Sequence, residues 1–577
     1  MYVNIIHIMD VQIWMEIRSV SILFEEDRIM TPELAKRVEE IALALGQVRS
    51  VVDTPGEIDA ANKVYEIFSG MDYWKKHPEN LYFVPVKNDP LGRKSCTAIL
   101  EGEKGNSKKT VIMIGHIDHV GISDYGNLQE YSNSPFELME KFKEIELPPS
   151  AKRDLESGEY IFCRGLFDMK TGDAAIMAVM ELISKDIENF EGNLIFSGVC
   201  DEEGNSGGVL NCDPDYVRLA EERGYEYLAM LDADYITEEY EGDPNKYIYI
   251  GTVGKTMPTF YIVGKETHVG ESFKGLDPNQ IAAAITMRVN LNPEFADVAD
   301  GEVALPPITL KQRDLKTEYS VQTAKAATIY FNYATHCSTP EVILEKMLKV
   351  AKECFEETMD VLNARYKKFC EMARRDYTPM PFVPRAMSFD QLMDAVRKEV
   401  PNLDELVKAK AEELMKTDMD SRDRSTAICA YVHDMWSDRD PVVIVYFSSP
   451  YYPHVFIEGS SQKDKNLIAA VQKAVAETKT DYQIGYKKFF PYISDLSYAA
   501  VPDETVVETF KSNMPGYGIT YDLPFDTIKK LNLPVLDIGA FGKDAHRWTE
   551  RIEKRFSFNV TPELIYRTLI NLLEISK

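Results

Sequence analysis

The chain has 577 residues, of which 45% are hydrophobic and 27% are charged. This length exceeds what one ordinary hydrophobic core accommodates, so the sequence predicts two domains or one domain with a large insertion. The formal net charge of −28 argues against a nucleic-acid-binding surface, because phosphate backbones bind clustered Lys and Arg side chains.

The cysteines and the N-terminus bear on the cellular compartment. The 8 cysteines are far apart and form no CxxC pair, which favours reduced, mostly buried thiols in the cytoplasm. The first 29 residues are apolar but include Asp10, Glu16 and Arg18, and they lack a basic start and a small-residue cleavage site, so we expect no signal peptide and no membrane attachment. Because "MTPELAKRVEEIALAL" begins a well-formed helix at Met30, we interpret residues 1–29 as an N-terminal extension or as the product of an upstream start codon.

Strand and helix patterns alternate through the first part of the chain. Thr31 can cap a helix with an apolar face, and "SVVDTPGEIDAANKVYEIF" predicts a loop followed by a second helix. The expected elements that follow are strands at 81–86, 97–100 and 111–115, a helix at 173–184, a strand at 193–200, a helix near 214–223 and a strand at 227–231. This alternation indicates an α/β fold with a largely parallel sheet.

The pattern changes near Gly251. "YIYIGTVGKTMPTFYIVGKETHVG" predicts paired strands, "DPNQIAAAITMRVNL" a helix, "ATIYFNYAT" a strand, and the charged stretch from Thr339 to Arg375 a long helix. After the strand "PVVIVYFSS", the α/β pattern returns from Lys463 and ends with the strand "LPVLDIGAF" and the helix "TPELIYRTLINLLEI". The sequence therefore predicts an α/β domain at residues 30–250 and 458–577, interrupted by an α+β insertion at residues 251–457.

Acidic side chains and histidines stand at the predicted ends of several strands, where ligands bind in open α/β sheets. "GHIDHV" places His116 and Asp118 on one side of the strand, whereas the odd spacing of His119 points it away. The other candidates are Asp168 in "CRGLFDMKTGDAA", Asp201, Glu202 and Glu203 in "GVCDEEGNSGG", Asp232 and Asp234 in "AMLDADY", and His546 in "GAFGKDAHRWTERI". Each pattern alone also fits a core histidine, a helix-start aspartate or a solvated charge run. Their order and joint placement favour one ligand site.

This series of motifs resembles the dinuclear zinc metallopeptidase family M20 across nearly the whole chain. Within that family, "FFPYISDLSY" and "YFNYAT" resemble the subgroup of the arginine-utilisation protein RocB. The resemblance implies a three-layer catalytic domain with a mainly parallel sheet of the zinc-peptidase/phosphorylase-like type, and an inserted α+β lid and dimerisation domain. It also implies two divalent metal ions, with zinc expected and cobalt or manganese as alternatives.

The same resemblance assigns roles to individual residues. Asp168 would bridge the two ions, Asp118 would orient a metal-binding imidazole, and Glu202 would be the general base. His268 in "KETHVG" matches the histidine of the lid domain that stabilises the oxyanion of the reaction. The implied metal ligands are His116, Asp168, Glu203, Asp234 and His546, and Asp232 remains an alternative to Asp234.

The resemblance implies a hydrolase that cleaves an amide bond in a small peptide or an N-acylated amino acid, in arginine or amino-acid catabolism. It further implies a homodimer formed through the inserted domain. A hydrolase of another C–N bond and a non-catalytic amino-acid-binding descendant of the family remain alternatives. The segment at about 356–440 is longer than the lid of the family requires, so substrate-pocket and dimer contacts do not transfer simply to this chain.

Overall fold

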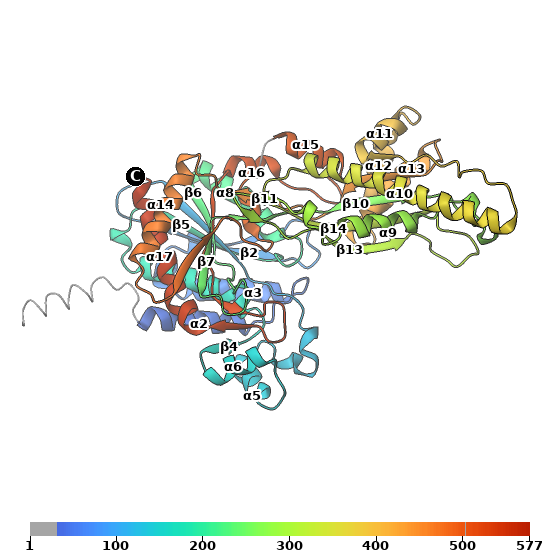
Figure 1. Ribbon diagram of the computed structural model, residues 1–577. Helices are drawn as coiled ribbons and strands as arrows, with labels where there is room; N and C mark the ends of the chain where they lie inside the picture. Colours follow the sequence, from blue (N-terminus) through green and yellow to red (C-terminus); the bar gives the residue numbers. More distant parts are fainter. Residues whose placement is uncertain (1–31, 502–503) are drawn as a thin grey trace, which may run out of the picture. The chain divides into compact units, whose positions relative to one another are not determined.

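The computed structural model describes residues 32–501 and 504–577, which form two compact units (Figure 1). Among the described residues, the first unit contains 32–248, 459–486 and 536–577, and the second contains 249–458, 487–501 and 504–535. The extension proposed for residues 1–29 lies outside the described residues. Both units combine helices and strands, and the α/β class expected from the sequence is confirmed.

Residues 487–535 belong to the second unit, whereas the sequence analysis placed them in the α/β domain. Their helices have the same local pattern as those of the first unit, but their apolar side chains pack elsewhere. The ring of Phe510 stacks on Phe447 of the second unit, with ring centroids 5.7 Å apart. Local periodicity shows which face of a helix is apolar, but it does not show which sheet receives that face.

The first unit is built on an eight-stranded sheet with the order β1-β2-β5-β3-β6-β19-β7-β18. β3 pairs in parallel with β5 and β6, while β2 pairs antiparallel with β1 and β5. Its strands are β1 (Leu81–Pro85), β2 (Lys94–Glu101), β3 (Lys109–His116), β5 (Asn193–Val199), β6 (Glu226–Asp232), β7 (Asn245–Tyr249), β18 (Gln483–Lys487) and β19 (Val535–Asp537). The central strands read as continuous apolar runs, because both faces of the sheet are covered.

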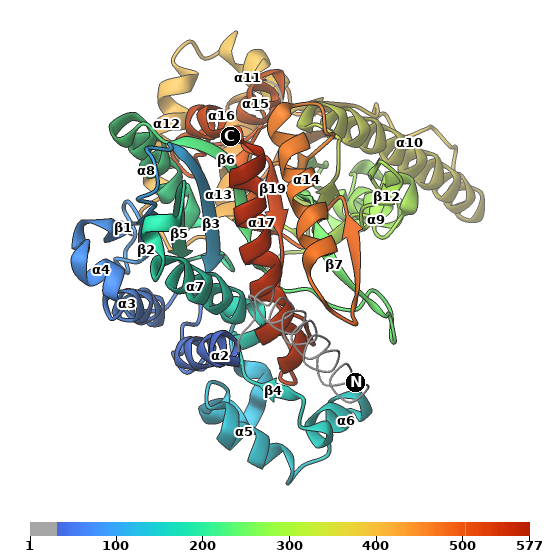
Figure 2. The same cartoon turned by 90° about the vertical axis from the view of Figure 1, so that its left-hand side faces the viewer.

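Helices cover both faces of this sheet (Figure 2). Phe196 of β5 contacts Phe68 of α3, whereas the neighbouring Ser197 hydrogen-bonds Thr97 of β2, on the face where Ser95 of β2 lies beside Gly208 of α8. Because successive side chains of a strand point to opposite faces, α3 and α8 lie on different sides, which gives three layers. The helices of this unit are α2 (Pro32–Gly46), α3 (Gly56–Ser69), α4 (Asp72–Lys76), α5 (Pro135–Phe142), α6 (Pro149–Ser157), α7 (Thr171–Ser184), α8 (Gly207–Arg223), α14 (Gln462–Glu477) and α17 (Thr561–Ile575).

A small three-stranded sheet joins two distant parts of the chain within the first unit. It has the order β20-β21-β4 and consists of β20 (Gly542–Lys543), β21 (Arg551–Glu553) and β4 (Tyr160–Phe162). Arg551 pairs with Phe162 in the antiparallel β21–β4 register. The sheet therefore brings the segment that follows β4 next to the segment between β20 and β21.

The second unit contains a mainly antiparallel sheet with the order β13-β14-β10-β16-β15, and β9 also pairs with β14. The strands of the second unit, in this sheet and in two small two-stranded sheets, are β8 (Gly251–Thr252), β9 (Gly254–Thr256), β10 (Pro258–Val263), β11 (Val298–Ala299), β12 (Glu302–Val303), β13 (Ile308–Asp314), β14 (Ala326–Thr335), β15 (Ala386–Ser388), β16 (Val442–Phe447) and β17 (Val455–Phe456). Its helices are α9 (Pro278–Val289), α10 (Pro340–Ala373), α11 (Phe389–Arg397), α12 (Leu403–Leu414), α13 (Ser421–Met435), α15 (Glu504–Ser512) and α16 (Phe525–Leu531).

The segment 356–440 forms part of the hydrophobic core of the second unit. It supplies the end of α10 together with β15 and α11–α13, and Leu392, Ile428 and Val432 pack in one cluster with Ile444 and Tyr446 of β16. The extra length is therefore folded structure that covers one side of the sheet.

The cysteines are free, and all except Cys337 are buried. In the described part of the chain, no helix combines the length and the apolar character that crossing a bilayer requires.

Candidate metal centre

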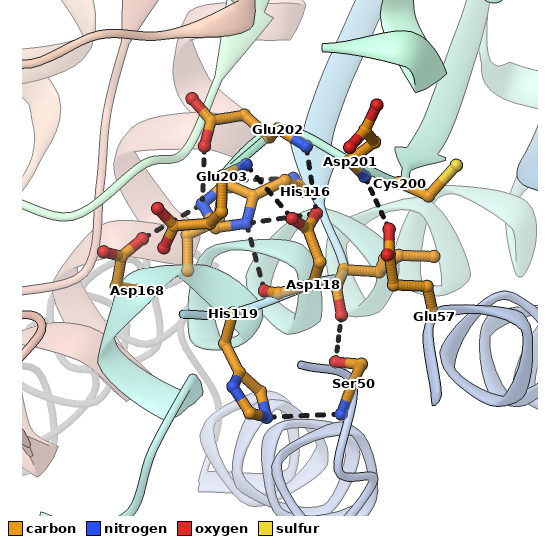
Figure 3. A network of polar contacts seen from close by, with 12 residues as sticks. Ser50, Glu57, His116, Asp118, His119, Asp168, Cys200, Asp201, Glu202 and Glu203 are labelled. Carbon is orange, nitrogen blue, oxygen red and sulfur yellow. Dashed lines mark hydrogen bonds and ion pairs between the residues drawn. The ribbon is translucent and has the colours of Figure 1, made fainter. Parts of the chain in front are cut away.

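His116 is the last residue of β3, where the strand leaves the core. Its side chain is 3% exposed, and its Nδ1 donates to the carbonyl oxygen of Asp118 at 3.2 Å. Because a carbonyl oxygen can only accept, this contact assigns the proton to Nδ1 and leaves Nε2 to face the site. Figure 3 shows the ring between the Asp118 segment and the carboxylates of Asp168 and Glu202.

Asp168 lies in the short helical turn η3 (Leu166–Lys170) that precedes α7. Its own φ of −114° and ψ of 97° are not helical, so its side chain turns toward the end of β3. Oδ1 lies 3.0 Å from His116 Nε2, and Oδ2 lies 2.9 Å from His546 Nε2. One carboxylate therefore faces two imidazoles through separate oxygens, which is the arrangement of a ligand that bridges two ions.

The turn after β5 carries three acidic side chains in succession, and they separate in the structure. Asp201 turns away from the centre toward Arg93, with 2.7 Å between Oδ1 and Nη1. Glu202 places Oε2 3.9 Å from His116 Nε2, and Glu203 places Oε1 2.9 Å from His546 Nε2. A charged run that sequence alone could assign to solvent thus delivers two carboxylates to one centre.

Asp118 holds that turn in place. Its side chain is fully buried, and its two oxygens accept from the backbone N–H groups of Glu202 at 3.2 Å and Glu203 at 3.1 Å. Its carboxylate lies 3.8 Å from His116 Nδ1, whereas its carbonyl oxygen is closer. Asp118 therefore contacts the imidazole mainly through its backbone and uses its side chain to position the two glutamates.

The charges around the two histidines indicate a cation site. Burial alone would lower the pKa of His116, but Glu202, Asp168 and Asp118 hold that pKa well above its usual range. Burial likewise opposes protonation of His546, yet Asp168 and Glu203 raise its pKa to about 11. Both imidazoles thus lie where the surrounding carboxylates attract positive charge.

The donor set fits a metal ion. Ligand atoms of His116, Asp168 and Glu203 all lie within 4.8 Å of one another. Two donors bound to one tetrahedral zinc at about 2.0 Å lie roughly 3.3 Å apart, close to the observed contacts of 2.9 and 3.0 Å. His546 Nε2 faces two carboxylate oxygens at once, and a cation placed among these atoms would attract all of them. Imidazole and carboxylate are ligands that Zn²⁺ binds.

Asp232 is the last residue of β6, and Asp234 lies two residues beyond it. Both are buried, and each accepts from the N–H of the next residue. Burial raises the pKa of Asp234 well above its usual range, and the charge of Asp168 adds to that effect. Asp232 also acts on Asp234 and on the buried carboxyls of Asp173 and Asp537. The charge of Asp168 links Asp234 to the candidate centre, and the choice of Asp234 over Asp232 as a ligand stays a prediction.

Other residues support the centre without a signal in the sequence. Glu57, in the first turn of α3, is fully buried and accepts from the N–H groups of Asp53 at 2.7 Å and Asp201 at 2.8 Å. It also lies 3.2 Å from Arg93 Nη1. Burial and the charge of Asp118 raise the pKa of Glu57 to about 8. These partners are up to 144 positions apart, so only the fold reveals them.

Two further histidines, His119 and His268, were considered in the sequence. His119 accepts from Ser50 N–H at 3.2 Å through Nε2, and its Nδ1 donates to the carbonyl oxygen of Val120 at 2.8 Å, so both nitrogens have structural roles (Figure 3). His268 belongs to the second unit, where it is exposed and accepts from the N–H of Gly270. The oxyanion role expected for His268 stays a prediction.

Comparisons with known proteins identify the family of this chain. The model of the family described as peptidase family M20/M25/M40 matches residues 140–519 of this chain. The chain is 33% identical to the protein RocB of Bacillus subtilis over 545 residues, which cover 94% of this chain and 95% of RocB. It is also 33% identical to the uncharacterised protein YqjN of the same organism over 540 residues, covering 92% of this chain and 96% of YqjN.

Among solved structures, the YXEP protein of Bacillus subtilis is described as a dinuclear metal binding peptidase from the M20 family. Its TM-score with this chain is 0.48 at 11% identity, with coverage of 94% of this chain and 99% of that one.

The extent of the family match and of the RocB alignment defines the class of this protein. The chain belongs to peptidase family M20/M25/M40, and it is a hydrolase of that family. Within the family it is a relative of RocB, as its motifs predicted.

Proposed function

We propose that this protein is a metal-dependent hydrolase that cleaves an amide bond in a small peptide or an N-acylated amino acid. The observation that carries the proposal is the placement of Asp168, whose two oxygens contact the Nε2 atoms of His116 and His546 at 3.0 and 2.9 Å. Glu203 completes one side of this arrangement. Carboxylates that are buried this close together are costly without a cation, because they repel one another.

The proposed ligands are assigned by what each donor atom faces. Asp168 would bridge two divalent ions, His116 and Asp234 would hold one of them, and Glu203 and His546 would hold the other. Zinc is the expected metal, and cobalt and manganese are the alternatives to test. When bound, the two ions would supply Lewis-acid activation of a water molecule and of the substrate carbonyl.

Glu202 is the proposed general base. Its Oε2 lies 3.9 Å from His116 Nε2, so it reaches the same space as the ligands, and its side chain is only 9% exposed. In this position it would take the proton of the attacking water and deliver it to the leaving amine. The carboxylate of Asp118 positions Glu202 and Glu203 by accepting hydrogen bonds from their backbone N–H groups. His268 is the proposed donor to the oxyanion.

The physiological setting follows from the relatives. The similarity to RocB supports a role in arginine or amino-acid catabolism, and the free, mostly buried cysteines support the cytoplasm. We include in the proposal a homodimer formed through the second unit. Size-exclusion chromatography with light scattering measures the oligomeric state, and a monomer at micromolar concentration would contradict this part.

The decisive experiment combines metal analysis with a substrate screen. Purified protein is expected to retain or rebind about two zinc, cobalt or manganese ions per chain. With each metal in turn, N-acyl amino acids and dipeptides, including arginine and ornithine derivatives, are tested alongside carbamoyl and amidino compounds. Turnover of only the latter compounds would assign a different C–N bond. A chain that binds no metal and turns over none of these would instead be a non-catalytic binding protein.

A further inference from the structure

Two segments carry the proposed ligands Asp168 and His546, and they meet at a buried ion pair. Arg164 Nη1 contacts Glu550 Oε2 at 2.6 Å, and each of these side chains is 1% exposed. Arg164 lies four residues before Asp168, and Glu550 lies four residues after His546. The pair joins positions that are 386 residues apart in the chain.

Glu550 binds the Asp168 segment at three points. Besides Arg164, its Oε1 accepts from the N–H of Gly165 at 2.8 Å, and its carbonyl oxygen accepts from the N–H of Cys163 at 3.3 Å. Gly165 has a φ of 71°, and an added Cβ would lie 2.9 Å from the ring of His119. The backbone before Asp168 is thus closely packed on both sides, and Glu550 contacts it on one side.

The opposite side of the same segment is also fixed. Arg164 donates its N–H to the carbonyl oxygen of Ser132 at 2.8 Å, and its own carbonyl oxygen accepts from Asn133 Nδ2 at 3.2 Å. Its second guanidinium nitrogen, Nη2, contacts Asp124 Oδ2 at 2.7 Å. These contacts hold Arg164 itself, whereas Glu550 is the partner that lies in the segment of His546.

The segment of His546 is a compact turn that ends at Glu550. Glu550 N–H donates to the carbonyl oxygen of Arg547 at 2.9 Å, and Thr549 Oγ1 donates to Asp544 Oδ2 at 2.7 Å. His546 has a φ of 63°, so its backbone is held in a conformation that few non-glycine residues adopt. A shift of Glu550 would therefore move both His546 and the backbone that leads to Asp168.

From this geometry we infer that Glu550 is a positioning residue of the metal centre: through Arg164 and Gly165 it sets the separation of the Asp168 and His546 donor atoms. The inference rests on the proposed metal-dependent function. The side-chain oxygens of Glu550 contact Arg164 and the backbone N–H of Gly165, so Glu550 acts on the donor atoms through the two segments. Partners of this kind typically change metal affinity 10- to 100-fold when they are replaced.

The test measures metal binding by the full-length protein independently of turnover. Chelator-stripped Glu550→Gln protein is titrated with Zn²⁺ by calorimetry, and the absorption spectrum of its Co²⁺ form is recorded. The control is Glu563→Gln, which removes a largely buried carboxylate, 11% exposed, from an ion pair with Arg567 at 2.9 Å on α17. We expect Glu550→Gln to weaken Zn²⁺ binding about 10- to 100-fold and to change the Co²⁺ spectrum, with both unchanged in the control.

The Glu550→Asp variant provides a second measurement if the glutamine variant does not fold. It keeps the buried charge for Arg164 but is one methylene shorter, so it cannot hold both Arg164 and Gly165 at the observed distances. The same loss of Zn²⁺ affinity is expected. Wild-type affinity in either folded variant, or an equal loss in Glu563→Gln, would overturn the inference. Wild-type protein that binds no metal would instead contradict the proposed function itself.

Discussion

At the scale of single residues, the candidate centre separates side chains that the sequence places side by side. Glu202 and Glu203 are neighbours, yet one approaches His116 and the other His546. The sequence identified both because they follow a buried strand and precede a glycine-rich turn. It could not identify Glu57 or the pairing of Arg164 with Glu550, because the partners are distant in the chain and follow no local period.

The separation of the two glutamates gives opposite expectations for the same substitution. Glu202→Gln should keep the metal content and lower kcat about 10²- to 10⁴-fold, because an amide cannot accept the proton of the water. Glu203→Gln should lose metal, because it removes a ligand carboxylate. Metal analysis and kinetics on both variants check this. A Glu202→Gln enzyme with wild-type kcat would remove Glu202 from the proposed mechanism.

Asp232, at the end of β6, and Asp234, two residues on, can be separated in the same way. The charges of Asp168 and His116 act on the carboxyl of Asp234, Asp232 acts on Asp173, and both aspartates act on Asp537. We therefore expect Asp234→Asn to reduce metal content to about one ion per chain or lower, and Asp232→Asn to retain both. Inductively coupled plasma mass spectrometry gives the stoichiometry. The reverse result would make Asp232 the ligand.

At the scale of elements, the structure confirms the strands whose sequences are continuous apolar runs. The run Val111–Ile114 lies inside β3, and the run expected at 193–200 becomes β5 (Asn193–Val199). Residues 487–535 belong to the second unit and not to the α/β domain expected from the sequence, because amphipathic helices such as α15 and α16 can cover either sheet. Which sheet they cover depends on contacts such as that of Phe510 with Phe447, which no local pattern encodes.

One helix of the second unit carries a titratable group in its buried face. His433 of α13 is 1% exposed, and neither ring nitrogen has a hydrogen-bond partner among the described residues. Burial lowers the pKa of His433 to about 4, below the value of about 6.5 in an unfolded chain. The unfolded state therefore binds the proton first, and the stability contributed by the neutral ring is lost as pH falls from 6.5 toward 4.

The lowered pKa of His433 predicts how a substitution at this position changes the loss of stability in acid. His433→Leu fills the buried face of α13 with an apolar side chain that does not titrate. The melting temperature of this variant should therefore fall less between pH 7 and pH 5 than that of the wild type. The slope attributable to one such group is at most about 1.4 kcal/mol per pH unit. His77→Gln, at a side chain that is 38% exposed, is the control and should follow the wild type. Parallel curves for His433→Leu and wild type would contradict the prediction.

At the scale of the whole molecule, the five proposed ligands come from segments between positions 116 and 546, yet all belong to the first unit. The insertion of a separate unit within the catalytic part explains why the ligand motifs are widely spaced in the sequence. Their order could be recognised without coordinates because His116 ends a strand and the other ligands lie in short loops or turns that follow strands. The division of the chain between two cores could be located only approximately.

Because every proposed ligand belongs to the first unit, metal should stabilise that unit selectively. A ligand that binds only the native state, when present at 100 times its Kd, adds about 2.7 kcal/mol of stability. We expect EDTA to lower the melting temperature and Zn²⁺ to restore it. Hydrogen exchange should show metal-dependent protection in residues 109–120, 163–170, 200–206 and 542–550. Protection of β10 and β16 in the core of the second unit should change little in the same samples. Equal changes in both units, or identical melting with and without EDTA, would contradict a metal centre confined to the first unit.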